Sequence, residues 1–149
     1  PKETFSARKA RIVRCINCGK EFKPYKTSRD KYCSMKCSGE YIYKQNIKKW
    51  LNGEISGSQK YGYSDFVREY LFRLHNNRCQ ICGWGEKNKT TNKIPLQIHH
   101  IDGDCLNNRL DNLQLLCPNC HSLTENFGSK NKNATKGRSA YFGRVKKAD

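Results

Sequence analysis

Eight of the nine cysteines stand in two quartets whose spacing is typical of tetrahedral zinc sites. The members of the first quartet are Cys15, Cys18, Cys33 and Cys37. The members of the second quartet are Cys79, Cys82, Cys117 and Cys120. Only 36% of the 149 residues are hydrophobic, so a large apolar core is not expected. The sequence therefore predicts a small α+β protein that is stabilised by two structural Zn²⁺ ions.

The formal net charge of +16 is concentrated at the two ends of the chain. Residues 1–60 carry 15 Lys and Arg against 5 Asp and Glu, whereas residues 61–125 carry 7 of each kind. Residues 126–149 carry 7 basic residues against 1 acidic residue. Because counterion release favours binding of a polyanion to basic segments, this pattern indicates a nucleic acid partner. The alternative is a basic surface that is simply solvated.

The chain carries no sequence signal for a membrane or for secretion. No apolar stretch approaches the roughly 20 residues of a membrane helix, and no signal peptide opens the chain. We therefore expect a cytoplasmic protein with no membrane partner. Disulfides rarely persist in that compartment, which favours metal binding as the role of the cysteines.

Composition divides the chain into four segments. They are a zinc-finger module with a basic arm (1–38), a basic helix and linker (39–60), a globular domain (61–127) and a basic tail (128–149). Helical spacing of apolar residues predicts that residues 38–51 form the linking helix, which ends before Asn52-Gly53. Residues 53–62 contain three glycines and are expected to form the linker.

The globular segment is expected to open with an amphipathic helix. Ser64 is the predicted N-cap of this helix, which runs to about His75 and carries an apolar stripe. We interpret the stripe as core and His75 as a surface or capping residue, not as a metal ligand.

Two strands and a short helix follow in the sequence. Residues 96–100 alternate as a strand, and residues 113–116 read as the strand that returns beside it. A helix is expected to begin near Pro118 and to carry His121 in its first turn. Cys105, the cysteine outside both quartets, is interpreted as a loop residue.

Three histidines and an asparagine accompany these elements at a characteristic spacing. His99 and His100 are adjacent, Asn112 lies twelve residues after His100, and His121 lies nine residues after Asn112. Adjacent strand residues point to opposite faces, so His99 and His100 are expected to have different roles. Together these side chains outline a phosphodiesterase site that uses one metal ion.

Residues 64–127 resemble the HNH nuclease family. The resemblance is carried by the motif His-His-Ile-Asp-Gly … Asn-Asn-Arg-Leu-Asp-Asn-Leu … Leu-Cys-Pro-Asn-Cys-His, which starts at His99 and ends at His121. In this resemblance His100 corresponds to the first histidine of the family name, Asn112 to the asparagine and His121 to the second histidine. His99 corresponds to the metal ligand before the general base. The resemblance implies a ββα-metal core that contains the second zinc site.

The resemblance also implies a role for each of these residues. His99 and His121 would hold one catalytic divalent ion, Mg²⁺ or Mn²⁺, at the scissile phosphate. His100 would accept a proton from the attacking water, since an imidazole titrates near neutral pH. The Asn112 amide would bind backbone across the loop and fix the aim of His100. An alternative for His99 and His121 is a structural zinc ion shared with the cysteines.

The basic residues of the arms, the linking helix and the motif are the candidate DNA contacts. They are Arg8, Lys9, Arg11, Arg14, Lys44, Lys48, Lys49, Arg109, Lys130, Lys132, Lys136, Arg138 and Arg144. Arg109 has an alternative role as the ion-pair partner of Asp102, Asp104 or Asp111. Asn107 and Asn108 are expected to be turn residues of the loop.

The leading hypothesis is a metal-dependent endonuclease that cuts duplex DNA, of the homing or phage HNH type, in a prokaryotic or phage-infected cell. A homodimeric HNH restriction endonuclease is the alternative within the enzymes, because two metal sites related by symmetry would cut both strands. From another class, a zinc-finger protein that binds nucleic acid without catalysis would share the cysteines and the charge. Such a protein has no need for the three histidines.

Overall fold

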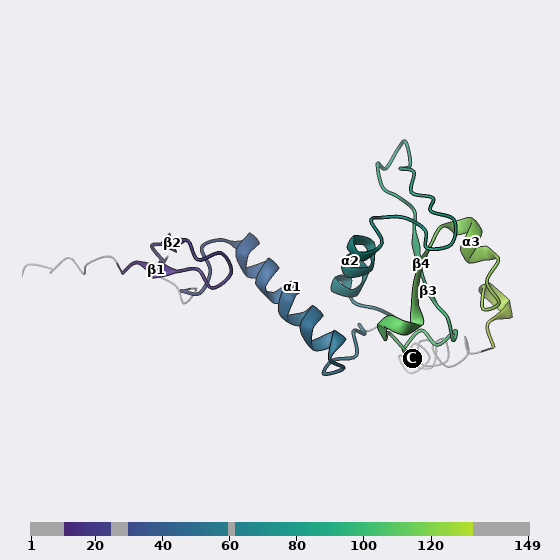
Figure 1. Cartoon of the computed structure of the whole chain (residues 1–149), viewed down its shortest axis with the longest axis horizontal. Helices are drawn as coiled ribbons and strands as arrows, with labels where there is room; N and C mark the ends of the chain where they lie inside the picture. The colour runs from purple at the N-terminus through teal and green to yellow at the C-terminus, as the bar shows by residue number, and fades with distance from the viewer. Residues whose placement is uncertain (1–10, 25–29, 60–61, 133–149) are drawn as a thin grey trace, which may run out of the picture. The chain divides into compact units, whose positions relative to one another are not determined.

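The computed structural model of the chain describes residues 11–24, 30–59 and 62–132, which are drawn in colour in Figure 1. The chain divides into two compact units, Pro1–Asn46 and Ile47–Asp149. Helix α1 (Met35–Leu51) contributes to both of them, since its residues 47–51 belong to the second unit. The segment boundaries drawn from composition remain predictions. In the described part of the chain, no helix is both long and apolar enough to cross a membrane.

The first unit is built from a short hairpin and the start of α1. Strands β1 (Val13–Arg14) and β2 (Glu21–Phe22) pair antiparallel. Helix α1 begins at Met35, three residues before the start that the sequence predicted. The reason is Ser34, whose hydroxyl accepts the backbone N–H of Cys37 at 3.1 Å and caps the helix.

The second unit contains a helix, a two-stranded hairpin and a short helix after it. Its elements in chain order are α2 (Asp65–Leu74), β3 (Gln97–His100), the 3₁₀ turn η1 (Leu110–Asn112), β4 (Leu113–Leu116), α3 (Pro118–Ser122) and the 3₁₀ turn η2 (Gly128–Lys130). Strands β3 and β4 are antiparallel, with Gln97 opposite Leu116 and His100 opposite Leu113. Helix α2 contacts β4, α3 contacts both strands, and the hairpin lies between the two helices in Figure 1.

An apolar core joins α2, the hairpin and the end of α1. Its most deeply buried side chains, all 0% exposed, are Val67, Leu71, Leu115 and Leu116. Trp50 belongs to the same cluster, and its ring packs edge-on against Phe66 and Tyr70. The final turn of α1 is therefore part of the second unit's core and not only a connection to it.

Helix α2 and the strands of this unit lie within one residue of their predicted bounds. Strand β4 has the predicted bounds, and β3 starts one residue later than predicted, at Gln97. Ser64 occupies the N-cap position of α2, but its hydroxyl donates to the Gly57 carbonyl at 2.6 Å instead of capping the helix. Gly57, a buried residue of the segment before the helix, supplies this acceptor, which sequence spacing alone could not reveal.

The segment that was expected to be a linker packs against the core. The Ser64 backbone N–H donates to the Gly57 carbonyl at 2.8 Å, and Ser58 forms an antiparallel bridge with Tyr63. Gly57 adopts φ of +69°, and a Cβ atom there would lie 2.6 Å from Nε1 of Trp50. A residue with a side chain would therefore be strained at position 57 and would also collide with the core.

We predict that Gly57→Ala destabilises the second unit more than Gly53→Ala does. Both glycines have positive φ, but a Cβ at Gly53 would meet no atom within 4 Å. The shared backbone strain cancels in the comparison, so the clash with Trp50 should leave a difference of about 1–3 kcal/mol in the free energy of unfolding. Urea denaturation of the two zinc-loaded variants measures it. Equal midpoints would contradict the packing described for Gly57.

Candidate active site

The β3–β4 hairpin separates the two adjacent histidines. His99 is 7% exposed, and the centroid of its ring lies 5.2 Å from that of His121 on α3. His100 instead neighbours Tyr63, with 6.4 Å between the ring centroids. Because successive strand residues point to opposite faces, the pairing of His99 with His121 leaves His100 free for a separate role.

The environment of His99 and His121 favours neutral imidazoles. Burial lowers the pKa of both rings, and the charges of His121 and His100 lower the pKa of His99 further. The Gln97 side-chain oxygen lies within hydrogen-bond distance of Nδ1 of His121, and a proton on Nδ1 would leave the Nε2 lone pair available for a metal ion. A neutral imidazole with a free lone pair is the form that binds a metal ion.

A cavity of about 360 Å³ opens beside His99. Its lining is partly apolar, through Ile101 and Leu123, and partly polar, through Glu125 and Asn126. Glu125 was not singled out in the sequence, because a single exposed carboxylate has no distinguishing pattern. In the structure this residue brings an acidic side chain to the cavity that contains His99.

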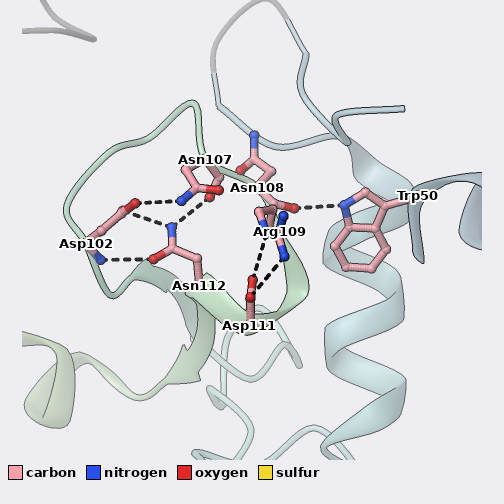
Figure 2. A network of polar contacts seen from close by, with 7 residues as sticks. All are labelled: Trp50, Asp102, Asn107, Asn108, Arg109, Asp111 and Asn112. Atoms are coloured by element: carbon pink, nitrogen blue, oxygen red, sulfur yellow. Dashed lines mark hydrogen bonds and ion pairs between the residues drawn. The ribbon is translucent and has the colours of Figure 1, made fainter. Parts of the chain in front are cut away.

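Asn112 closes the loop that connects β3 to β4, as Figure 2 shows. Its Oδ1 accepts the backbone N–H of Asp102 at 3.0 Å, and its Nδ2 donates to the Asn107 carbonyl at 2.8 Å. The same Nδ2 donates to the Asp102 carboxylate at 2.9 Å. Although burial raises the pKa of Asp102, hydrogen bonds from Asn107, Asp104 and Asn112 lower it overall. Asn112 thus holds the two ends of the loop together without touching the His100 ring.

Asn108 is the residue of the site that the sequence interpretation missed. It is 1% exposed, and its Oδ1 lies 2.8 Å from Nε2 of His100. Both Asn107 and Asn108 lie in the loop, as expected, but their partners differ, because Asn107 binds the Asp102 carboxylate at the surface. No periodicity or spacing in the sequence separates two consecutive asparagines in a loop.

Arg109 forms an exposed ion pair with Asp111, with 3.2 Å between Nε and Oδ1 (Figure 2). This contact raises the pKa of Arg109 and lowers that of Asp111. Of the three carboxylates considered from sequence, Asp111 is therefore the partner. Such an exposed pair adds little stability, and a phosphate contact by Arg109 stays a prediction.

The other predicted DNA contacts have few internal partners. Arg11 and Arg14 form exposed ion pairs with Asp30 and Glu21 in the first unit. Lys44 donates to the Asn17 side chain at 3.3 Å. Four lysines, Lys48, Lys49, Lys130 and Lys132, are exposed. Five predicted contacts lie outside the described residues: Arg8, Lys9, Lys136, Arg138 and Arg144.

Both cysteine quartets assemble into clusters that could hold a metal ion. Within each quartet, Cys15/Cys18/Cys33/Cys37 or Cys79/Cys82/Cys117/Cys120, the sulfur atoms all lie within 4.8 Å of one another. Among the described residues, His99 and His121 belong to neither cluster, so each quartet is complete without a histidine. Cys105 is exposed and lies outside both clusters.

The electrostatics of the second quartet suit a cation. Burial raises the pKa of Cys79, but hydrogen bonds from the backbone of Cys82, Cys117 and Ile81 outweigh burial and lower that pKa to about 6. The neighbouring Cys82 sulfur, followed by burial, raises the pKa of Cys120 to about 12. Four thiolates cannot share this space unless positive charge is added, and Zn²⁺ is the ion that such donor sets prefer.

Comparison with known proteins shows that the region of the site is similar to endonucleases. Residues 79–127 match the family model described as HNH endonuclease. The chain is also 46% identical over 61 residues to the H-N-H endonuclease F-TflIV of Escherichia phage T5. The matched region covers 39% of this chain and 25% of that relative, so the chain spans about a quarter of the length of the relative. No solved structure matches the chain.

We predict that the purified chain contains two equivalents of zinc and that each quartet accounts for one of them. Cys79→Ser should remove one equivalent and unfold the second unit, because the binding energy of structural zinc is also folding energy. Elemental analysis with circular dichroism measures both effects. Cys105→Ser is the matched control and should keep both equivalents. Full zinc content in Cys79→Ser would contradict the assignment.

Proposed function

We propose that this chain, whose residues 79–127 match the HNH endonuclease family model, is a metal-dependent endonuclease that hydrolyses phosphodiester bonds of duplex DNA. One observation carries the proposal. The ring centroids of His99 and His121 lie 5.2 Å apart, and His100 is separately held by a part-buried hydrogen bond to Asn108. Purely structural metal binding does not need this separation of one imidazole from the other two.

His99 and His121 are the proposed ligands of the catalytic divalent ion. The depressed pKa of both rings and the contact of the Gln97 side-chain oxygen with Nδ1 of His121 fit this role. A bound divalent ion supplies Lewis-acid stabilisation of the negative charge that develops at the scissile phosphate. Mg²⁺ and Mn²⁺ are the proposed ions, whereas Zn²⁺ is proposed for the two cysteine quartets, which makes the hairpin and α3 a zinc-stabilised ββα-metal core.

His100 is the proposed general base. Its imidazole accepts a proton from the attacking water, a contribution that is typically about 10²–10⁴-fold in rate. Asn112 is the proposed support for this step, because its hydrogen bonds to the Asp102 N–H and the Asn107 carbonyl fix the loop that follows His100.

The proposed DNA contacts lie in basic segments on both sides of a nearly neutral centre. Residues 1–60 and 126–149 carry the net positive charge, whereas residues 61–125 have equal numbers of acidic and basic residues. Phosphate contacts by the basic segments position a duplex without reading its sequence. By analogy with the phage relative, we propose an enzyme of the phage or homing type, cytoplasmic in an infected cell.

We predict that plasmid DNA is cleaved when Mg²⁺ or Mn²⁺ is added to the zinc-loaded chain and that chelation of the added ion stops the reaction. His100→Ala should lower turnover about 10²–10⁴-fold through loss of the base, with unchanged zinc content. Gel electrophoresis of supercoiled plasmid measures the rate. His75→Ala is the control, because His75 is the C-cap residue of α2 and no role in the site is proposed for it.

The products of this assay separate the alternatives. Open circles that appear before linear DNA indicate a monomer that nicks, and direct formation of linear DNA indicates a dimer that cuts both strands. Plasmid that stays intact with both ions at low salt would instead favour a zinc-finger protein that binds DNA without cutting it.

We predict that deletion of residues 133–149 weakens DNA binding and flattens its salt dependence. The deleted residues include five Lys and Arg, so the slope of log K against log salt should fall by up to about 4.5. Fluorescence anisotropy with a labelled duplex at several salt concentrations measures the slope. The zinc content should not change, and equal slopes for the two proteins would remove the proposed role of the tail.

A further inference from the structure

We propose that Asn108 is a positioning residue that fixes the tautomer and the ring orientation of His100 and leaves Nδ1 as its proton-accepting nitrogen. The chemical role of this arrangement rests on the nuclease function proposed above. The arrangement itself is a matter of hydrogen bonding and can be tested without a cleavage assay.

The first step is the orientation of the Asn108 amide. Its Nδ2 lies 2.8 Å from Oγ of Ser58 and 3.3 Å from the Gly62 carbonyl oxygen. A carbonyl oxygen can only accept a hydrogen bond, so the amide group that faces Gly62 must be the NH₂ group. The opposite orientation would place two oxygens against each other. Asn108 therefore presents Oδ1, and not Nδ2, to His100.

The second step is the proton on His100. An amide oxygen is only an acceptor, so the 2.8 Å contact between Asn108 Oδ1 and His100 Nε2 requires a hydrogen on Nε2. In the neutral imidazole the other nitrogen, Nδ1, then carries the lone pair. A general base must present a lone pair to the water that it deprotonates, and in this ring Nδ1 is the nitrogen that can do so.

The third step is the rigidity of the support. Asn108 is 1% exposed, and its backbone carbonyl accepts a hydrogen bond from Nε1 of Trp50 at 2.8 Å (Figure 2). The Asn108 side chain is held by Ser58 and Gly62, and its backbone by Trp50. All three partners precede residue 79, where the match to the family model begins. A segment outside the family match thus determines how the His100 ring is held.

A purely structural role for Asn108 makes a different prediction. If Asn108 served only to anchor the loop, its loss would lower stability but would leave the His100 tautomer and the turnover of the folded enzyme unchanged. The tautomer is therefore the decisive measurement, because it reports the hydrogen bond on the imidazole directly and not the stability of the loop.

The experiment uses ¹⁵N-labelled full-length chain loaded with zinc, at a pH where the imidazoles are neutral. Long-range ¹H–¹⁵N correlation spectra distinguish protonated from unprotonated ring nitrogens, and His100→Ala identifies the His100 signals. We expect Nε2 to carry the proton in the wild-type protein. Asn108→Ala should shift the His100 tautomer populations towards Nδ1–H. Asn107→Ala is the matched control and should leave them unchanged, since the Asn107 side chain binds Asp102.

Kinetics provide the second readout. Asn108→Ala should lower kcat by about 10–100-fold, as is typical when a hydrogen-bond partner of a functional histidine is removed, and should leave KM for plasmid DNA nearly unchanged. His75→Ala, the control of the plasmid assay, should change neither constant. Equal kcat values for folded Asn108→Ala and the wild-type chain would overturn the positioning role.

The outcomes separate this proposal from the proposed nuclease function. A wild-type His100 with its proton on Nδ1 would overturn the role of Asn108 even if the chain cleaves DNA. If Nε2 carries the proton but the chain does not cleave DNA, the result would support the positioning of His100 by Asn108 and would overturn the nuclease function. If Asn108→Ala does not fold, the wild-type tautomer still decides the question.

Discussion

The antiparallel pairing of β3 with β4 is the constraint on which the rest of the site depends. The register places His100 opposite Leu113 and His99 opposite Gln114. A shift of one residue would exchange the faces of the two histidines and would bring His100, not His99, beside His121. The register is held by burial, since Ile98 and Leu115 pair across the strands in the core. The chemistry of the site therefore follows from the packing of apolar side chains beneath it.

Much of the support for this hairpin comes from residues that precede it by many positions. Trp50, at the end of α1, fills the core and binds the Asn108 carbonyl. Gly57 allows the chain to pass against the indole ring, and the next residue, Ser58, binds the Asn108 amide. A minimal nuclease module that begins at Cys79 would lack these contacts. The second compact unit, from Ile47 onwards, is accordingly larger than the 79–127 segment that matches the HNH family.

Two kinds of sequence signal predicted the structure well, for different physical reasons. A short apolar run located β4 to the residue, because Leu113, Leu115 and Leu116 are all buried in the core. The cysteine spacing indicated two clusters, because only a narrow range of separations lets four sulfurs meet around one ion. The start of α1 was missed by three residues, because the cap by Ser34 lies between Cys33 and Cys37 in a segment that was interpreted only through its cysteines.

By itself the sequence indicated the two cysteine quartets and the strand–loop–strand–helix order, since both follow from spacing, and the resemblance to the HNH family singled out the three histidines. Only the tertiary structure decided which asparagine contacts His100. Asn108 and Asn112 are both short amides in one polar loop, and nothing local distinguishes them. Asn112 binds the ends of that loop, whereas Asn108 is buried by Trp50 and Ser58, which lie more than forty residues earlier in the chain. Such a contact depends on how distant segments pack, so a local sequence pattern cannot predict it.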